Sequence, residues 1–532
     1  MKKTCKKCSI NFEITSSDLE FYKKISPKFE PSPNLSQGER DNWNNNFLIP
    51  TPTLCPDCRQ QRRLAFRNER NLYKRDCDAT GKNIISIYSP DKNLKVYNSD
   101  FWWSDNWDAP GYWIDFDFNI GFFEQFWELM KEVPFLPNVA INNENSDYTH
   151  LSSYNKDCYL LFNWSYNEEV KYAYWVQNNK KSLDLYWTTS SELCYENIDC
   201  KWNFKSFFII NSINCNSCLF LENCINCEEC ILSNNLDWKK YFILNKQYSK
   251  EDYKNKKEEI SENINKYKKI FYKEIISWNN IFDIQNSQNC IWKYIEDSQN
   301  CFDCVDIKKS EDCKYCYNVF ELKSSMDVNF FGFPSELLYE SNNVWLNSFK
   351  IIFSSYLYNC QETIYSYNCH NSNNLFWCVW LKNKSYCILN KQYTKEEYNK
   401  LVPKIIEKMK QDLEWWEFFS VSLSPFWYNE TVAQEYFPLN KEEIIKQNFN
   451  YSDYESPKPN VEKIIPADKL PENISNIPDD ILNWAIKCEV SWKPFRIIKQ
   501  ELEFYRKHNL PVPHKHPDIR HLERMKLRNP RK

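Results

Sequence analysis

The chain has 532 residues, of which 42% are hydrophobic and 17% aromatic, so it can build several domains and is not disordered as a whole. Its formal net charge of -4 is nearly neutral for this length, which excludes a strong global field that would attract nucleic acid or membranes. The first residues lack the apolar segment of a signal peptide, and no stretch has the apolar length of a membrane span. We therefore expect a cytoplasmic protein without membrane contact.

The scarcity of two residue types argues against many enzymes. The chain has five glycines, and they are too far apart for phosphate-binding loops, dinucleotide fingerprints or nucleophile elbows. Four of its six histidines lie near the C-terminus, so a histidine-based catalytic site in the middle is not expected. The 23 cysteines are odd in number and no export signal precedes them, which favours reduced thiols and metal ligands over disulfides.

Four cysteines near the start of the chain form two pairs with metal-ligand spacing. Within each pair two residues separate the thiols, which is the spacing of a zinc knuckle, and two knuckles complete a tetrahedral site. The predicted ligands are Cys5, Cys8, Cys55 and Cys58. Because four thiolates fill the tetrahedron, no open position remains to activate water, and we predict one structural zinc ion without metal catalysis.

Basic residues follow the second knuckle at helical spacing. The run comprises Arg59, Arg62, Arg63, Arg67, Arg70, Lys74 and Arg75, opposed by Glu69 and Asp76. A chain that leaves a closing knuckle usually enters a helix, on which arginines three and four apart share a face. Such a face can contact the phosphates of RNA or DNA without reading their sequence. The alternative is that the arginines pair with acidic side chains of the body or form a solvated face.

An aromatic segment comes next, between residues 101 and 127. Its later positions have the spacing of an amphipathic helix seated on a core, namely Phe122, Phe123, Phe126 and Trp127. Before them, Asp115 and Asp117 alternate with phenylalanines, as in a half-buried strand. The alternative is that exposed rings stack on bases or sugars and that the two carboxylates cleave a glycosidic bond on a β-helix.

The body of the chain contains an internal duplication. The hexapeptide Ile-Leu-Asn-Lys-Gln-Tyr occurs at 243–248 and again at 388–393, a shift of 145. A shift of 143 matches Cys158 with Cys301 and Lys171-Tyr172 with Lys314-Tyr315. A shift of 144 matches Glu192, Leu193, Tyr195 and Glu196 with Glu336, Leu337, Tyr339 and Glu340. Two units of the same architecture therefore follow one another.

Short apolar pieces within each unit are separated by turn residues at intervals of 11 and 12. Ser287, Ser298 and Ser310 each begin such a turn. The spacing is typical of a β-solenoid or a β-sandwich, and we favour a parallel β-solenoid, in which small Cys and Ser side chains stack as ladders between coils. Because glycine is scarce, asparagine should form the tight corners.

Each unit ends with a helix signal. Ser249-x-x-Asp252 and Thr394-x-x-Glu397 are N-cap patterns, the second a complete capping box. They predict helices from about 250 to 277 and from about 395 to 419, with the usual boundary error of a few residues. We expect these helices to close the exposed end of each strand stack.

Cysteine pairs in the body suggest a second metal centre or part of an iron-sulfur motif. The residues concerned are Cys215, Cys218, Cys224, Cys227, Cys230, Cys301, Cys304, Cys313 and Cys316. Under the shift of 145, however, Cys230 corresponds to Leu375, which cannot bind a metal. We therefore favour small buried core residues, and a further site in the first unit alone stays open.

The end of the chain repeats its beginning. A shift of 483 places Cys5 on Cys488, and a shift of 461 places Arg59, Arg63 and Arg67 on Arg520, Arg524 and Arg528. The remaining ligand positions hold Ser491, His516 and Ile519. Because Cys488 and His516 alone do not close a structural zinc site, we predict a metal-poor copy whose arginines again offer a nucleic-acid contact.

A resemblance to known proteins rests on the first 70 residues and on the repeated body. The chain has Cys-x-x-Cys, Phe-Glu-Ile, Asp-x-x-Phe-Tyr and then Cys-Pro-Asp-Cys-Arg-Gln-Gln-Arg-Arg-Leu-Ala-Phe-Arg-Asn-Glu-Arg, followed by a Cys-rich body with Asn-Lys-Gln-Tyr repeats. In these motifs it resembles a group of uncharacterised bacterial zinc-ribbon proteins over nearly its whole length. The resemblance implies zinc at the four N-terminal cysteines and no particular activity, and the changes at Ser491 and Ile519 depart from it.

We therefore predict a multidomain, mainly β protein with α-helices. Its parts are a zinc-ribbon or treble-clef-like module with a basic helix (1–76), an aromatic-rich connecting region (77–147), two solenoid-like β-repeat units with capping helices (148–280 and 281–422), a Pro-rich connector (423–486) and a degenerate ribbon module (487–532). The predicted function is a non-enzymatic zinc-binding scaffold, with nucleic acid contacted through the arginines. The alternatives are a protein-protein assembly scaffold without nucleic acid and a carbohydrate-binding or carbohydrate-cleaving β-helix protein. A small-molecule substrate is not expected.

Overall fold

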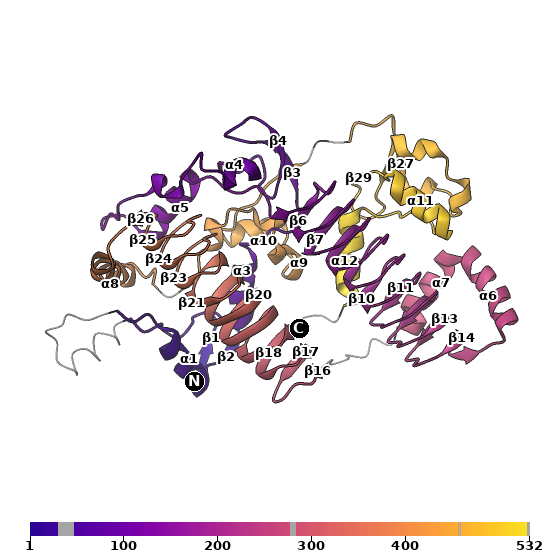
Figure 1. Cartoon of the computed structure of the whole chain (residues 1–532), viewed down its shortest axis with the longest axis horizontal. Coiled ribbons are helices and arrows are strands. Elements are labelled where there is room, and N and C mark those ends of the chain that lie inside the picture. The colour runs from indigo at the N-terminus through magenta and orange to yellow at the C-terminus, as the bar shows by residue number, and fades with distance from the viewer. Residues whose placement is uncertain (30–46, 277–283, 416, 456, 458, 529–532) are drawn as a thin grey trace. The chain divides into compact units, whose positions relative to one another are not determined.

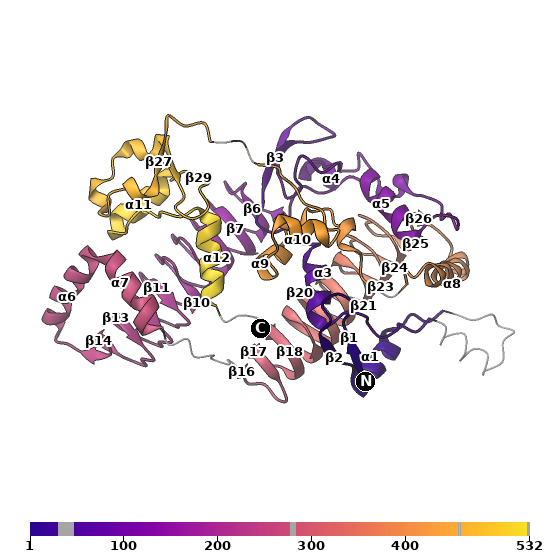
Figure 2. The same cartoon turned by 180° about the vertical axis from the view of Figure 1, so that it is seen from behind.

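The computed structural model describes residues 1–29, 47–276, 284–415, 417–455, 457 and 459–528 (Figure 1). The chain divides into two compact units, one made of residues 1–137 with 281–454 and the other of residues 138–280 with 455–530. Each unit contains one large, mostly parallel sheet and one small terminal module, which Figure 2 shows from behind. The prediction of a mainly β protein with helices is confirmed.

The second unit is built on a sheet that we call the first β-stack. Its strands are β5 (Ala140–Ile141), β6 (Thr149–Ser153), β7 (Tyr159–Ser165), β8 (Lys171–Gln177), β9 (Tyr186–Thr189), β10 (Ile198–Lys201), β11 (Phe207–Ile210), β12 (Leu219–Glu222), β13 (Glu228–Asn234), β14 (Lys240–Ile243) and β15 (Lys246–Gln247). They stack in sequence order, and all pairs are parallel except the last. Partners on neighbouring strands are 12 apart in the sequence, as with Tyr186 beside Ile198 and Phe207 beside Leu219.

The first unit is built on a matching sheet, the second β-stack. Its strands are β16 (Ile284–Gln285), β17 (Ile291–Glu296), β18 (Gln299–Lys308), β19 (Glu311–Lys314), β20 (Tyr317–Trp345), β21 (Ser348–Ile352), β22 (Ser355–Tyr358), β23 (Gln361–Ile364), β24 (Asn373–Phe376), β25 (Ser385–Ile388) and β26 (Lys391–Gln392). Most of its parallel pairs have the same spacing of 12, such as Cys301 beside Cys313. The two stacks belong to different compact units, so the duplication seen in the sequence is a duplication of whole sheets.

Left-handed backbone recurs at every third residue of both stacks. From Leu151 to Leu244 every third residue has a positive φ, and the same holds from Asp297 to Phe333 and from Lys350 to Leu389. Each repeat is thereby divided into four segments of three, since 12 divided by three is four. We expected asparagine to form these corners. Asparagine occupies many of them, but bulky residues such as Trp175 and Phe208 occupy others, so stacking between repeats outweighs the local preference for asparagine.

The second β-stack departs from its period beside Gly332. Here β20 pairs with β21 at a shift of 13, as in Ser335 beside Ser348. Gly332 has φ +144°, and a Cβ atom on it would lie 2.0 Å from the carbonyl oxygen of Phe320. The one extra residue is therefore accommodated where the backbone approaches the preceding repeat too closely for any side chain.

Small polar and thiol side chains form ladders inside the stacks. The hydroxyl of Ser298 accepts the N–H of Ser310 at 3.1 Å, and the hydroxyl of Ser310 accepts the N–H of Leu322 at 3.1 Å. Cysteine thiols lie close to carbonyl oxygens two residues earlier and nine residues later, as Cys301 does at 3.2 and 3.6 Å. These contacts give buried backbone N–H and carbonyl groups a hydrogen-bond partner, as expected for small buried residues that stack between repeats.

Helices and short antiparallel strands cover the C-terminal end of each stack. The helices are α6 (Lys250–Glu262), α7 (Ile264–Ile270) and the π-helix η2 (Phe271–Ile275) in one unit and α8 (Lys395–Gln411) in the other. Both N-caps form as predicted, since Ser249 accepts the N–H of Asp252 and Thr394 forms a capping box with Glu397. The helix predicted from about 250 to 277 is interrupted between α6 and α7, and its predicted end at Ser277 lies outside the described residues. The helix predicted from about 395 to 419 is shorter, since α8 ends at Gln411.

The aromatic segment packs on the second β-stack. It forms α4 (Ser99–Trp103), η1 (Ala109–Tyr112) and α5 (Phe122–Glu132), after the hairpin of β3 (Tyr73–Asp76) and β4 (Asn83–Ser86). Phe126 is fully buried against Trp377 and stacks on Phe419, so α5 is the predicted amphipathic helix on a core. Residues 113–118 do not form the predicted strand, and Asp115 instead pairs with Lys391.

The segment predicted as one extended connector has structure of its own. It includes η3 (Val421–Leu423), η4 (Tyr428–Glu430), α9 (Val432–Tyr436), α10 (Lys441–Lys446), β27 (Lys463–Pro466), η5 (Ala467–Lys469), η6 (Ile474–Asn476) and η7 (Asp479–Asn483). Its first part folds with the first unit, where the N–H of Val432 donates to the carbonyl of Arg67 at 2.8 Å. Its last part folds with the second unit, because β27 pairs with the C-terminal module.

The terminal modules share one architecture. The N-terminal module contains β1 (Lys2–Thr4), β2 (Asn11–Glu13), α1 (Ser16–Ile25) and α3 (Pro56–Leu64). The C-terminal module contains β28 (Trp484–Lys487), β29 (Pro494–Phe495), α11 (Lys499–His508) and α12 (Pro517–Leu527). Both have an antiparallel hairpin, and Phe12 beside Lys3 corresponds to Phe495 beside Ile486 at the predicted shift of 483.

Candidate metal centre

The four predicted ligands lie together in the N-terminal module. The Sγ atoms of Cys5, Cys8, Cys55 and Cys58 all lie within 4.8 Å of one another, and those of Cys8 and Cys55 are 3.6 Å apart. In a tetrahedral zinc site with Zn–S bonds near 2.3 Å, two sulfurs are separated by about 3.8 Å. Cys5, Cys55 and Cys58 are buried and Cys8 is exposed, so one edge of the group faces solvent.

Two elements bring the thiols together. Cys5 and Cys8 lie in the turn between β1 and β2, where the N–H of Cys5 donates to Ile10 and the N–H of Ser9 donates to Cys5. Cys55 is the N-cap of α3, and Pro56 at the first helical position fixes the entry into that helix. The first turn and the helix are tied by the N–H of Lys6, which donates to the carbonyl of Thr53 at 3.1 Å.

The local electrostatics favour the thiolate form at Cys55, whereas the hydrogen bond to Cys55 raises the pKa of Cys58. The hydrogen bond from the neighbouring Cys58 thiol lowers the pKa of Cys55. The positive end of the α3 dipole lies at the same residues, and it stabilises negative charge. Because thiolate is the form of cysteine that binds metals, the four residues fit a structural ion with sulfur ligands. Tetrahedral sulfur coordination suits zinc best and iron next, and these four side chains would hold it.

The C-terminal module keeps the backbone of this site but only one of its four cysteines, Cys488. The N–H of Cys488 donates to Lys493 at 3.0 Å and the N–H of Glu489 donates to His514 at 3.3 Å, which are the counterparts of the Cys5 and Lys6 bonds. The Cys488 Sγ accepts the N–H groups of Val490 and Ser491, each at 3.4 Å. The His516 ring caps α12 through Nδ1, which accepts the N–H of Asp518 at 3.2 Å. Among the described residues, the four N-terminal cysteines form the one group of three or more ligands that converge on a point, and Cys488 and His516 are not part of another.

The arginines after Cys58 are buried in ion pairs with the second β-stack. Arg59 donates to Asp327 at 2.7 and 2.9 Å, and Arg62 donates to both oxygens of Glu340 at 2.9 Å. Arg63 lies 3.2 Å from Asp327 and 3.6 Å from Glu340. The carboxylates are at most 1% exposed.

Burial decides between the two interpretations of this run. Arg59, Arg62, Arg63 and Arg67 are between 0 and 8% exposed, and Arg67 also lies over the ring of Phe330 at 3.4 Å. Arg70 is half-buried. The four buried arginines do not form the exposed face that phosphate contact requires, and the structure shows the alternative of pairing with acids of the body. Nucleic-acid binding through them has no support in the geometry.

The arginines of the C-terminal module dock on the first β-stack in the same way. Arg520 and Arg524 both pair with Asp184, with Arg524 at 2.6 Å, and Arg528 pairs with Asp199 at 2.8 Å. Arg520 and Arg524 are each 5% exposed, and Asp184 is fully buried. The second predicted nucleic-acid contact is thus also an internal interface.

The two interfaces correspond residue by residue. A shift of 143 relates Asp184 to Asp327, and the shift of 461 relates Arg59 to Arg520, so the same carboxylate receives the same arginine. Aromatic contacts repeat as well: Arg59 over Tyr315, Arg520 over Tyr172, Tyr22 against Tyr339 and Tyr505 against Tyr195. Asp327, Glu340 and Asp184 were not among the predicted site residues. The shift that matches Lys171 with Lys314 also matches Asp184 with Asp327, and that signal could have found them.

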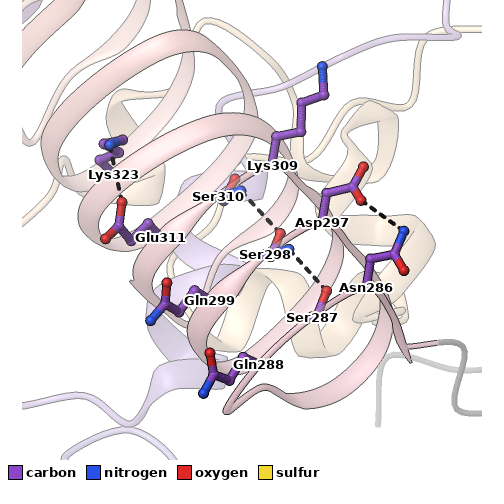
Figure 3. A pocket seen from close by; sticks show the side chains of 10 residues that line it. All are labelled: Asn286, Ser287, Gln288, Asp297, Ser298, Gln299, Lys309, Ser310, Glu311 and Lys323. Atoms are coloured by element: carbon purple, nitrogen blue, oxygen red, sulfur yellow. Dashed lines mark hydrogen bonds and ion pairs between the residues drawn. The ribbon is translucent and has the colours of Figure 1, made fainter.

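Within the described ranges, the other candidate features do not form a site. The second β-stack has a groove of about 670 Å³. Among its lining residues, shown in Figure 3, Ser287, Ser298 and Ser310 form a hydrogen-bonded ladder and Lys323 pairs with Glu311. The groove is open and polar, and these side chains bind one another. The predicted carbohydrate carboxylates lie elsewhere, with Asp115 paired to Lys391 and Asp117 accepting from Asn119.

In the described part of the chain, no helix is long and apolar enough to cross a membrane.

No family model and no curated protein matches this chain. Among solved structures, a chain with the description "putative acetyltransferase from Desulfovibrio desulfuricans G20" is 7% identical, and the match covers 44% of this chain and 58% of that chain. Its TM-score is 0.11, so this likeness carries no argument about fold or activity.

Proposed function

We propose that the protein is a non-enzymatic, zinc-binding scaffold for protein assembly. In this proposal each β-stack is a parallel β-solenoid with four short sides per coil, and each terminal module derives from a zinc ribbon. The observation that carries the proposal is the group of four converging thiols, which leaves a bound ion no open coordination position for catalysis. The ion would fix the first turn of α3 and the hairpin that faces it.

Proteins are a better-supported class of partner than nucleic acids. The arginines that would contact phosphates are buried in ion pairs. Large aromatic side chains, by contrast, are exposed on the first β-stack, with Trp202 60% and Trp238 76% accessible. Exposed aromatic rings of this kind are enriched in the contact surfaces of proteins.

Purification of the native protein from its own cells tests this proposal. We expect zinc to copurify together with a protein partner that stays bound when salt is raised, because apolar contacts are insensitive to screening. The double variant Trp202→Ser and Trp238→Ser should release the partner without changing the zinc content. Copurified RNA or DNA that is lost at high salt would refute the assembly proposal.

A further inference from the structure

The metal centre and the arginines that dock on the second β-stack share one helix. Cys55 caps α3, Cys58 lies in its first turn, and Arg59 follows directly. The guanidinium of Arg59 also donates to the carbonyl of Leu54 at 2.7 Å, the residue before Cys55. The position of the first docking arginine therefore depends on the same turn that supplies two of the four ligands.

With α3 docked on the second β-stack, buried carboxylates are neutralised by arginines of the helix. Asp327 is 0% exposed and Glu340 is 1% exposed, and Arg59, Arg62 and Arg63 provide their counter-charges. If α3 moved away, the ion pairs of these two carboxylates with the three guanidinium groups would be lost at once. Two discrete states, docked and open, are therefore favoured over intermediate positions of the helix.

The C-terminal module makes the same docking contacts although its ligand set is incomplete. Arg520 and Arg524 pair with Asp184 although the module has lost three of the four ligands. The C-terminal module also has a contact that its twin lacks. Lys515 pairs with Glu523 of α12 at 2.6 Å, whereas the equivalent positions of the N-terminal module hold Leu54 and Arg62, which cannot form an ion pair.

We propose that metal binding at Cys5, Cys8, Cys55 and Cys58 controls the docking of α3 on the second β-stack, whereas α12 stays docked on the first β-stack regardless of metal. The proposal rests on the proposed zinc site and adds a regulatory role to it. Zinc holds the helix start in the geometry that presents the arginines. Loss of zinc opens one module and leaves its twin closed, so the chain responds to metal supply at one of two equivalent interfaces.

Hydrogen exchange on the full-length chain tests this inference. Metal content is measured first, and exchange is then followed before chelation, after chelation and after zinc is restored. We expect amides of α3 and of residues 327–342 to exchange at least about tenfold faster without metal, with α12 and residues 184–199 unchanged. Cys58→Ser should reproduce the chelated pattern and Cys488→Ser should not. If Cys58→Ser does not fold, chelation and re-addition on the unaltered chain give the same comparison.

The possible failures are separable. A chain that binds zinc, loses it to the chelator and keeps α3 protected would overturn the control of docking and leave the zinc site intact. Equal loss of protection in α3 and α12 would also overturn it, because the effect would not be confined to the metal-bearing module. A chain that carries no metal when purified would refute the proposed site itself and the inference with it.

Discussion

Neutralising Asp327 should destabilise the first unit strongly. The Asp327 side chain is 0% exposed, accepts two hydrogen bonds from Arg59 and lies 3.2 Å from Arg63. Asp327→Asn keeps the shape but removes the charge, leaving two buried guanidinium groups short of a counter-charge. Breaking one side of a buried ion pair typically costs 3–5 kcal/mol, and because Glu340 still lies 3.6 Å from Arg63 we expect about 3 kcal/mol.

The duplication offers a matched control for this variant. Asp184→Asn removes the equivalent charge from Arg520 and Arg524, so it should destabilise the second unit by a similar amount and leave the first unchanged. Glu228→Gln breaks a pair with Lys240 that is nearly half exposed on both sides, and it should have little effect on the stability of either unit because solvent screens exposed pairs.

Urea unfolding followed by pulsed hydrogen exchange measures both units on one sample, because peptides from each report separately. The expected result is a lower midpoint for peptides of the first unit in Asp327→Asn and for peptides of the second unit in Asp184→Asn. If Asp327→Asn changed the free energy of unfolding of the first unit by less than about 1 kcal/mol, the ion pairs would not hold α3 in place and the reasoning would be refuted.

Three further variants test the core, a buried acid and the interior thiols. Burial raises the pKa of Glu430 from 4.5 to about 7, so its neutral form is favoured in the folded state, and the first unit should lose roughly 3 kcal/mol of stability as pH rises from 4.5 through 7. Glu430→Gln should remove this pH dependence of the urea midpoint, and an unchanged dependence would contradict the assignment. Phe126→Ala should cost about 3–5 kcal/mol in the same unfolding assay, because the ring is fully buried between Trp377 and Phe419, and a change below about 1 kcal/mol would count against that packing. Cys304→Ser should leave the metal content per chain unchanged, whereas a loss of metal would show that the interior cysteines bind an ion.

The group of four converging thiols could be predicted from the sequence because its chemistry is local. Two Cys-x-x-Cys pairs have few structural uses, and Cys5 and Cys55 meet as the spacing predicts. The duplications were also visible, since identical residues recur at constant shifts. The predicted helix caps at Ser249 and Thr394 formed for the same reason, because a cap depends on residues three apart.

The backbone geometry of the β-stacks was harder to predict from the sequence than the thiol group. Left-handed residues recur every third position, but their identities range from Asn211 to Trp187 and Leu193, so no residue type marks the corners. The period of 12 is visible in the positions of charged residues. Glu144 pairs with Lys156 and Glu168 pairs with Lys180, each across successive repeats.

The role of the arginines could not be read from their own neighbourhood. Arg59 and Asp327 are 268 residues apart in the sequence. A run of basic residues has the same sequence pattern whether its arginines contact phosphates or buried carboxylates. The composition gave a hint, because a nearly neutral chain has enough acidic residues to pair its arginines internally. The fold decided between the two by placing acidic residues of β20 opposite α3.

Metal analysis of the purified full-length chain by mass spectrometry examines the proposed site without further assumptions. One zinc ion per chain is expected, lost in Cys55→Ser and retained in Cys488→Ser, because the first residue is one of the four converging thiols and the second is not. A chain without metal, or one whose metal content is the same in Cys55→Ser, would contradict a four-thiolate site at the N-terminal module.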